Sequence, residues 1–319
     1  MNTDASTTES PASVSPLTST RAQPALRLVS TKGLSREEWL AYRRQGIGSS
    51  DAAAAVGLNP YQSPLELWLV KTGRDDHLPA VDPEDDTSPM FWGTVLEPVV
   101  AERYARRTGF KVRRCNAVLQ HPNPDKAWML ANIDREVVGH PEVQVLECKT
   151  AGEFGARLWR DGVPDYIQCQ VQHQLAVTGK QAADVAVLIC GQELRIHRIE
   201  RDEALIASLI ELERRFWQYV VTDTPPPVDG SDSSAQALQA LYPIDRGETL
   251  DLREDPELSA TFDSLVAVRV ELDARKATEA LLKQRIQERM GEASRALFAA
   301  GAVSWKKSKA GARRFLIHP

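Results

Sequence analysis

The chain has 319 residues, 42% hydrophobic and 26% charged, with a formal net charge of -5, which suits one large domain with appendages or two domains. No apolar stretch reaches the roughly 18 to 20 residues that span a bilayer, and no basic-then-apolar leader begins the chain, so we expect a cytoplasmic protein without a membrane partner. The four cysteines form no CxxC pair, which argues against a disulfide framework, a zinc site or an iron–sulfur cluster (Cys115, Cys148, Cys169 and Cys190).

The first third of the chain combines an irregular leader with short capped helices. Residues 1–30 are rich in Ser, Thr, Pro and Ala without apolar periodicity, which predicts a disordered leader. "SREEW" predicts a helix with Ser35 as N-cap and Glu38 at the capping-box position. "SPLELWLVKTG" predicts another, capped by Ser63 and ended by Gly73. The glycines of the intervening "RRQGIGSSDAAAAVGLNPY" break the first helix before a short alanine-rich one.

The middle of the chain alternates helical and β-type patterns. After an acidic loop at 75–89, "GTVLEPVVAERYARRTG" predicts a helix. Three β-type runs follow, "FKVRRCNAVLQH", "AWMLANIDREVV" and "VQVLECKT". "DYIQCQVQHQLAVTG" returns to a helical pattern, "AADVAVLIC" and "ELRIHRIE" predict two strands, and a helix is expected over 202–221. This order predicts an α/β core with a mixed sheet.

Three consecutive prolines, Pro225 to Pro227, end the last of these helices and predict a connector. We therefore expect one domain over 31–228 and a C-terminal extension over 229–319. Within the extension, 254–290 predicts a long charged helix and 296–319 a small β hairpin. The basic "WKKSKAGARRF" is typical either of a phosphate-tracking hairpin or of a solvated chain end, and we assign it no site role.

A candidate site begins at "VLECKTAG", where Glu147 and Lys149 stand two residues apart at the end of an apolar run. Strand alternation would put both side chains on one face, with Cys148 on the other. Such a pair is usually an ordinary ion pair. However, Asp134 ends the preceding β-type run, where a hairpin would bring its carboxylate beside Glu147. Two carboxylates, a main-chain carbonyl and a lysine make an oxygen-rich site suited to Mg²⁺ or Mn²⁺.

The spacing D-x(12)-E-C-K resembles the PD-(D/E)XK nuclease core, whose usual fold is a central mixed β-sheet flanked by helices. "EEWLAYRRQGIGSSDAAAAVGLNPYQSPLELWLVKTG", "WGTVLEPVVAERY", "ANIDREVV", "LECKT" and "PDYIQCQVQHQLAVTG" extend the likeness in the same order. Over about residues 34–228 the chain thus resembles the YqaJ-type viral recombinase family, to which phage lambda exonuclease is similar. Two features depart from the pattern. Ile133 stands where the motif has proline, and the segment between Asp134 and Glu147 is longer than a minimal turn.

The resemblance implies a role for each matching residue. Asp134 and Glu147 would bind the metal together with the main-chain carbonyl of Cys148, and Lys149 would orient and help deprotonate the attacking water. The remaining roles fall to four residues: Glu97 would serve a second metal through water, Gln170 would contact water or substrate, and Arg43 and Ser50 would bind a terminal 5′-phosphate.

Several of these residues have plainer interpretations. Glu97 could simply favour the first turn of its helix through the helix dipole. Arg44 competes with Arg43 for the phosphate role. Gln172 lies on a different side of its helix from the selected Gln170. A lone helical histidine such as His173 is more often structural than a ligand, so we leave it out of the site.

The resemblance further implies a Mg²⁺-dependent 5′-to-3′ exonuclease that acts on double-stranded DNA ends and leaves 3′ single-stranded tails for phage-type recombination. Mn²⁺ would substitute for Mg²⁺, with two ions per site. The expected partners are a single-strand annealing protein and further copies of the chain in a ring-shaped homo-oligomer.

Two alternatives remain open. One is a structure-specific or restriction-type endonuclease on the same core, which would need no 5′-phosphate pocket. The other is a non-catalytic DNA-binding assembly module, against which the joint presence of Asp134, Glu147 and Lys149 speaks. A CRISPR-type nuclease with an iron–sulfur cluster shares the core, but its cysteine spacing is absent.

Overall fold

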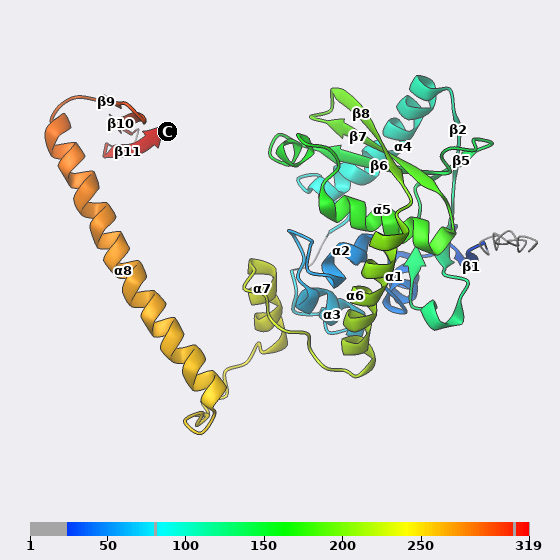
Figure 1. The fold of residues 1–319 in the computed structure, drawn as a ribbon, viewed down its shortest axis with the longest axis horizontal. Coiled ribbons are helices and arrows are strands. Elements are labelled where there is room, and N and C mark those ends of the chain that lie inside the picture. The colour runs from blue at the N-terminus through cyan, green and yellow to red at the C-terminus, as the bar shows by residue number, and fades with distance from the viewer. Residues whose placement is uncertain (1–23, 80–81, 309–310, 319) are drawn as a thin grey trace, which may run out of the picture. The chain divides into compact units, whose positions relative to one another are not determined.

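A computed structural model describes residues 24–79, 82–308 and 311–318. The chain forms two compact units, residues 1–244 and 245–319 (Figure 1). No helix within the described ranges combines the length and apolar character needed to cross a membrane.

The first unit begins with a strand that the sequence did not predict. Residues 1–23 of the expected leader lie outside the described residues, but β1 (Leu26–Ser30) pairs antiparallel with β3 (Ala117–Gln120). A bulge between Arg27 and Val29 interrupts the register. Assigning disorder to residues 26–30 was therefore wrong, because a strand ordered by a distant partner needs no apolar periodicity of its own.

Short helices follow, and their expected caps are confirmed. α1 (Arg36–Arg44) starts at the reciprocal capping box of Ser35 and Glu38. A single 3₁₀ turn, η1 (Ser49–Asp51), leads into the four-residue α2 (Ala52–Ala55). α3 (Pro64–Thr72) is capped by Ser63 and ends at Gly73, whose left-handed φ of 70° favours glycine.

The centre of the unit is a five-stranded mixed sheet in the order β2-β5-β6-β7-β8. Its strands are β2 (Lys111–Arg114), β5 (Arg135–Val138), β6 (Val145–Ala151), β7 (Ala182–Ile189) and β8 (Glu193–Glu200). Only β6 and β7 run parallel, and the other neighbours are antiparallel. The parallel pair requires a crossover, which α5 (Asp165–Thr178) provides. The expected mixed sheet flanked by helices is confirmed.

Helices cover both faces of this sheet (Figure 1). On one face, α4 (Pro89–Thr108) packs Val100 and Tyr104 against Leu146 of β6. On the other, α5 packs Val171 against Val145, and α6 (Glu203–Val221) joins the same core. Because β6 alternates between the two faces, its residues 145, 147 and 149 face α5.

A smaller sheet, β1-β3-β4, connects the N-terminal helices to the centre. β4 (Leu130–Ala131) lies next to the segment after α1, where the Leu130 N–H donates to Ile47 O at 2.8 Å and the Ile47 N–H donates to Trp128 O at 2.7 Å. Two further 3₁₀ turns, η2 (Pro124–Lys126) and η3 (Gly155–Trp159), complete the connections. The residues before η1 are thereby held against the strand that leads to Asp134.

The boundary between the two units lies later in the chain than the proline connector suggested. α7 (Asp232–Leu241) packs on α3, and the Ser233 hydroxyl accepts from the Ser63 N–H at 2.7 Å and donates to Glu66 at 2.6 Å. The expected domain boundary after residue 228 therefore differs from the division after residue 244. Prolines mark the end of α6 but say nothing of where the following chain packs.

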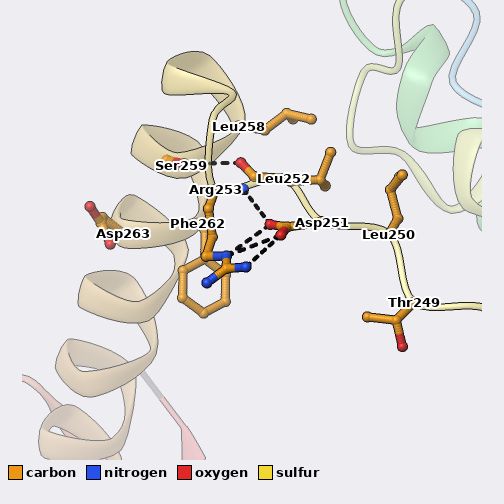
Figure 2. A pocket seen from close by; sticks show the side chains of 9 residues that line it. All are labelled: Thr249, Leu250, Asp251, Leu252, Arg253, Leu258, Ser259, Phe262 and Asp263. Atoms are coloured by element: carbon orange, nitrogen blue, oxygen red, sulfur yellow. Dashed lines mark hydrogen bonds and ion pairs between the residues drawn. The ribbon is translucent and has the colours of Figure 1, made fainter.

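The second unit contains the expected long helix, α8 (Pro256–Met290), and a small sheet. The expected hairpin of β10 (Gly301–Lys307) and β11 (Arg313–His318) gains a third strand, β9 (Arg295–Phe298). A pocket of about 580 Å³ lies beside the start of α8. Figure 2 shows its lining, which combines the Asp251–Arg253 ion pair with Leu258 and Phe262. It holds no cluster of catalytic groups, and we assign it no function.

Candidate active site

The pairing of β5 with β6 brings Asp134 to β6. Arg135, the first residue of β5, lies opposite Leu146. Asp134 stands just before it, and its Oδ2 accepts a hydrogen bond of 2.7 Å from the Cys148 N–H. The carboxylate therefore lies at the backbone of β6, next to Glu147, as the hairpin prediction required.

Glu147 is buried, at 2% exposure, and both of its carboxylate oxygens are occupied. Gln170 donates to Oε1 at 2.6 Å and Gln174 donates to Oε2 at 2.7 Å. The Lys149 ammonium lies 2.6 Å from the same Oε1. Lys149 also donates to Gln170 Oε1 at 3.0 Å, so one glutamine holds both the acid and the base.

The electrostatics of Asp134 and Glu147, which we call the acidic pair, favour a bound cation. Burial, followed by the negative charge of Glu147, raises the pKa of Asp134 to about 8. Burial opposes the charge of Lys149, but the carboxylates of Glu147 and Asp134 outweigh it and raise the lysine pKa. A positive charge bound beside Glu147 would favour the ionised form of Asp134.

The donor set fits a hard divalent ion. Within residues 24–79, 82–308 and 311–318, no three His, Cys, Asp or Glu side chains are grouped closely enough to hold a metal by themselves. The available oxygens are the carboxylates of Asp134 and Glu147, with the main-chain carbonyl of Cys148 between Glu147 and Lys149 on β6. Oxygen ligands of this kind suit Mg²⁺, which keeps several waters and needs few protein ligands.

Glu97 lies in α4 and reaches this centre through Arg135. The Arg135 Nη1 is 2.5 Å from Glu97 and donates to the main-chain oxygen of Asp134 at 2.7 Å. Arg135 is almost fully buried, whereas the Glu97 side chain is 29% exposed. In this arrangement the Glu97 carboxylate is bound to an arginine at the margin of the acidic pair.

Arg43 and Ser50 meet in a second cluster. The Arg43 guanidinium donates to Ser50 Oγ at 2.7 Å, forms an ion pair with Asp51, and lies 4.9 Å over the ring of Trp39. Its neighbour Arg44 instead pairs with Asp75 at 2.9 Å.

Lys71 and Asp51 form the buried base of this cluster. The Lys71 ammonium lies 2.6 Å from Asp51 Oδ2 and donates to Arg43 O at 2.8 Å. Burial would raise the pKa of Asp51, but Arg43 and Lys71 outweigh it and hold that pKa at about 2. Burial lowers the pKa of Lys71 while the charge of Asp51 opposes that shift. The Asp51 carboxylate is therefore held between the Arg43 guanidinium and the Lys71 amine.

One carbonyl links the two clusters. Ser49, next to Ser50, donates from its hydroxyl to Asn132 O at 3.4 Å. Gln174 donates to the same oxygen at 3.2 Å while it also binds Glu147. The sequence positions 49, 132 and 174 are far apart, yet they tie the arginine cluster to the acidic pair.

Some of these contacts were missed from the sequence. Gln174 stands four residues after Gln170 and so shares its helix face, a spacing that could have identified it. Gln172, in contrast, binds the backbone of Glu200 and Asp202 and supports the fold. No local signal marked Arg135, Asp51 or Lys71, because their partners come from other elements.

His173 has a structural environment. Its ring nitrogens lie 2.7 Å from Glu213 and 2.9 Å from the Leu130 carbonyl, and both side chains are fully buried. The histidine joins α5 to α6 behind the acidic pair.

Comparison with known proteins finds one matching family and three similar proteins. The model of the YqaJ-like viral recombinase domain matches residues 38–181. The uncharacterized protein YqaJ of Bacillus subtilis is 39% identical over 230 residues, which are 71% of this chain and 68% of the relative. Among solved structures, an alkaline exonuclease (LHK-Exo) from Laribacter hongkongensis is 25% identical, with 59% of this chain and 93% of that chain covered and a TM-score of 0.48. A phage-related exonuclease from Haemophilus somnus 129PT is 10% identical, with 56% and 96% covered and a TM-score of 0.39.

Proposed function

The chain belongs to the YqaJ-like viral recombinase family, and we propose that it is a Mg²⁺-dependent DNA exonuclease. It digests double-stranded DNA from a 5′ end and leaves a 3′ single-stranded tail. The observation that carries this proposal is the adjacency of Asp134 and Glu147, with Lys149 bonded to the same glutamine as Glu147.

The metal would be held by Asp134, Glu147 and the carbonyl of Cys148. When bound, a divalent cation supplies Lewis-acid charge relief at the scissile phosphate. Lys149, whose raised pKa keeps it an ammonium, stabilises negative charge on the attacking oxygen and orients the water. Gln170 fixes the ammonium and the Glu147 carboxylate relative to each other, so the reacting groups are positioned before DNA arrives.

Arg43 and Ser50 would bind the terminal 5′-phosphate. A guanidinium stacked on Trp39 and oriented by Asp51 keeps little rotational freedom, and it offers N–H groups in the geometry that phosphate oxygens accept. The shared contacts at Asn132 support a fixed placement of this pocket relative to Glu147. An end held in this way makes cleavage depend on a free terminus.

Digestion of linear duplex labelled at either end, with and without a 5′-phosphate, tests the proposal. We expect label to be released first from 5′-phosphorylated termini, only with Mg²⁺ or Mn²⁺, and no cutting of a closed circular duplex. Equal cutting of circular and linear DNA would instead establish the endonuclease alternative.

Three further properties are proposed from family membership: a second metal ion served by Glu97 through water, a ring-shaped homo-oligomer, and a single-strand annealing protein as partner. A cytoplasmic location is proposed with them. Light scattering of the purified chain tests the ring, which predicts a single species larger than the 35.4 kDa monomer.

A further inference from the structure

The three-stranded sheet of the second unit gathers cations on one face. Lys306 of β10 lies directly opposite Arg314 of β11, and Arg295 of β9 lies opposite Ser304, two residues before Lys306. Because directly opposed residues point to the same side of a sheet, Arg295, Lys306 and Arg314 share one side. All three side chains are exposed, and we call them the cationic face.

These cations have no counter-ions in the part of the chain that the structure describes. No ion pair there includes Arg295, Lys306 or Arg314, whereas on α8 Arg275 pairs with Glu271 and Lys276 with Asp273. Residues 291–319 contain six lysines and arginines against a single acidic residue, in a chain whose net charge is -5. Positive charge is therefore concentrated at this sheet.

The arrangement does not serve the stability of the sheet. Like charges directly opposite each other in an antiparallel pair repel. The Lys306–Arg314 pair is followed by Lys307 opposite Arg313, so two successive rungs of the ladder carry like charges. A bound polyanion would remove this repulsion.

The other face of the sheet fixes the cations in place. Arg313 lies 3.6 Å over the Trp305 ring and donates to the carbonyls of Trp305 and Gly291, at 3.0 and 2.7 Å. The Lys283 ammonium of α8 lies 5.4 Å over Phe315. The strands that carry the cationic face are thereby joined to the end of α8.

We propose that the cationic face binds the phosphate backbone of DNA without reading its sequence. The inference rests on the proposed function, which makes DNA the polyanion that this chain meets in every turnover. Lysine and arginine contacts to phosphates carry no sequence information but supply affinity through the release of counterions. The second unit thus adds a DNA contact outside the nuclease core, which holds the duplex while the first unit removes nucleotides.

The test measures how DNA binding depends on salt. The full chain carrying Lys149→Ala, to prevent digestion, is titrated against a blunt 5′-phosphorylated duplex at several NaCl concentrations. Arg295→Gln, Lys306→Gln and Arg314→Gln are combined in one variant. Each lost phosphate contact lowers the slope of log affinity against log salt by about 0.9, so we expect a slope smaller by about 2 to 3. At low salt the affinity falls at least tenfold.

The matched control removes three exposed cations elsewhere in the same unit, by Arg253→Gln, Arg275→Gln and Lys276→Gln. We expect its slope to equal that of the parent. If the slope of log affinity against log salt decreases equally in both variants, the change in net charge alone explains the decrease and the proposal is overturned. It is also overturned if the cationic-face variant keeps its DNA slope and loses binding to polyglutamate, which would identify an acidic protein as the partner.

The melting temperature reports the folding of each variant, and the salt slope reports its DNA binding. Removing opposed like charges should leave the melting temperature of the variant at or above that of the parent. If it melts lower, the single change Lys306→Gln must still lower the slope by about 1, or the proposal fails. If the wild-type chain, with Lys149 present, binds DNA with the full slope but never cuts it with Mg²⁺ or Mn²⁺, the proposed nuclease function is refuted and the cationic face stands.

Discussion

Replacing Asp134 by asparagine should change how the stability of the metal-free protein depends on pH. The folded state holds the Asp134 proton up to a pKa of about 8, whereas an unfolded aspartate loses it near about 3.9. Between these values the folded state binds more protons than the unfolded state, so the contribution of Asp134 to stability falls as pH rises. The slope is about 1.4 kcal/mol per pH unit where the difference is a full proton.

Asparagine keeps the shape and cannot ionise, so it removes this contribution alone. The assay is urea unfolding in EDTA from pH 5 to 8, followed by tryptophan fluorescence. Six of the seven tryptophans lie in the first unit, which makes the signal report on it. We expect the wild type to lose about 3 to 4 kcal/mol relative to Asp134→Asn across that range. Added Mg²⁺ should restore wild-type stability at pH 8 and leave the variant unchanged.

The comparison with the variant matters because other ionisable groups also make stability depend on pH, and their contributions cancel in the difference. A difference in stability that stays constant from pH 5 to 8 would refute the electrostatic account of the acidic pair. So would equal stabilisation of both proteins by Mg²⁺.

Two further pairs of substitutions test the contacts around the site. Gln174→Leu leaves Glu147 Oε2 without its donor, so we expect kcat to fall by about 10- to 100-fold. Gln172→Leu on the same helix should lower the melting temperature and spare kcat, and equal kcat losses would contradict the assignment. Arg43→Ala should raise KM for 5′-phosphorylated ends while 5′-hydroxyl ends are unaffected, and Arg44→Ala should change neither. Identical KM changes for both kinds of end would exclude a phosphate pocket at Arg43.

Most of the fold could be predicted from local sequence patterns. The capping box at Ser35 and the left-handed stop at Gly73 depend only on nearby residues, and both were predicted. β1 and α7 were missed because each is ordered by a distant partner, β3 for the strand and α3 for the helix. The third strand β9 joined the expected hairpin in the same way.

In the candidate site, too, contacts that follow from local patterns were predicted, and contacts that depend on tertiary packing were not. Strand alternation placed Glu147 and Lys149 on one face, and the hairpin brought Asp134 beside them. The buried pair of Asp51 and Lys71 could not be foreseen, since the two residues lie 20 positions apart and only the packing of α3 brings them together. Buried charges are set by tertiary contacts, and a sequence pattern does not report those.

Binding of Mn²⁺ followed by electron paramagnetic resonance tests the central claim most directly. The wild type is compared with Glu147→Gln and with Glu153→Gln, a control on an exposed neighbouring acid. The account predicts that Glu147→Gln abolishes tight Mn²⁺ binding and that Glu153→Gln binds as the wild type does. Equal Mn²⁺ binding by all three proteins would contradict a metal site between Asp134 and Glu147.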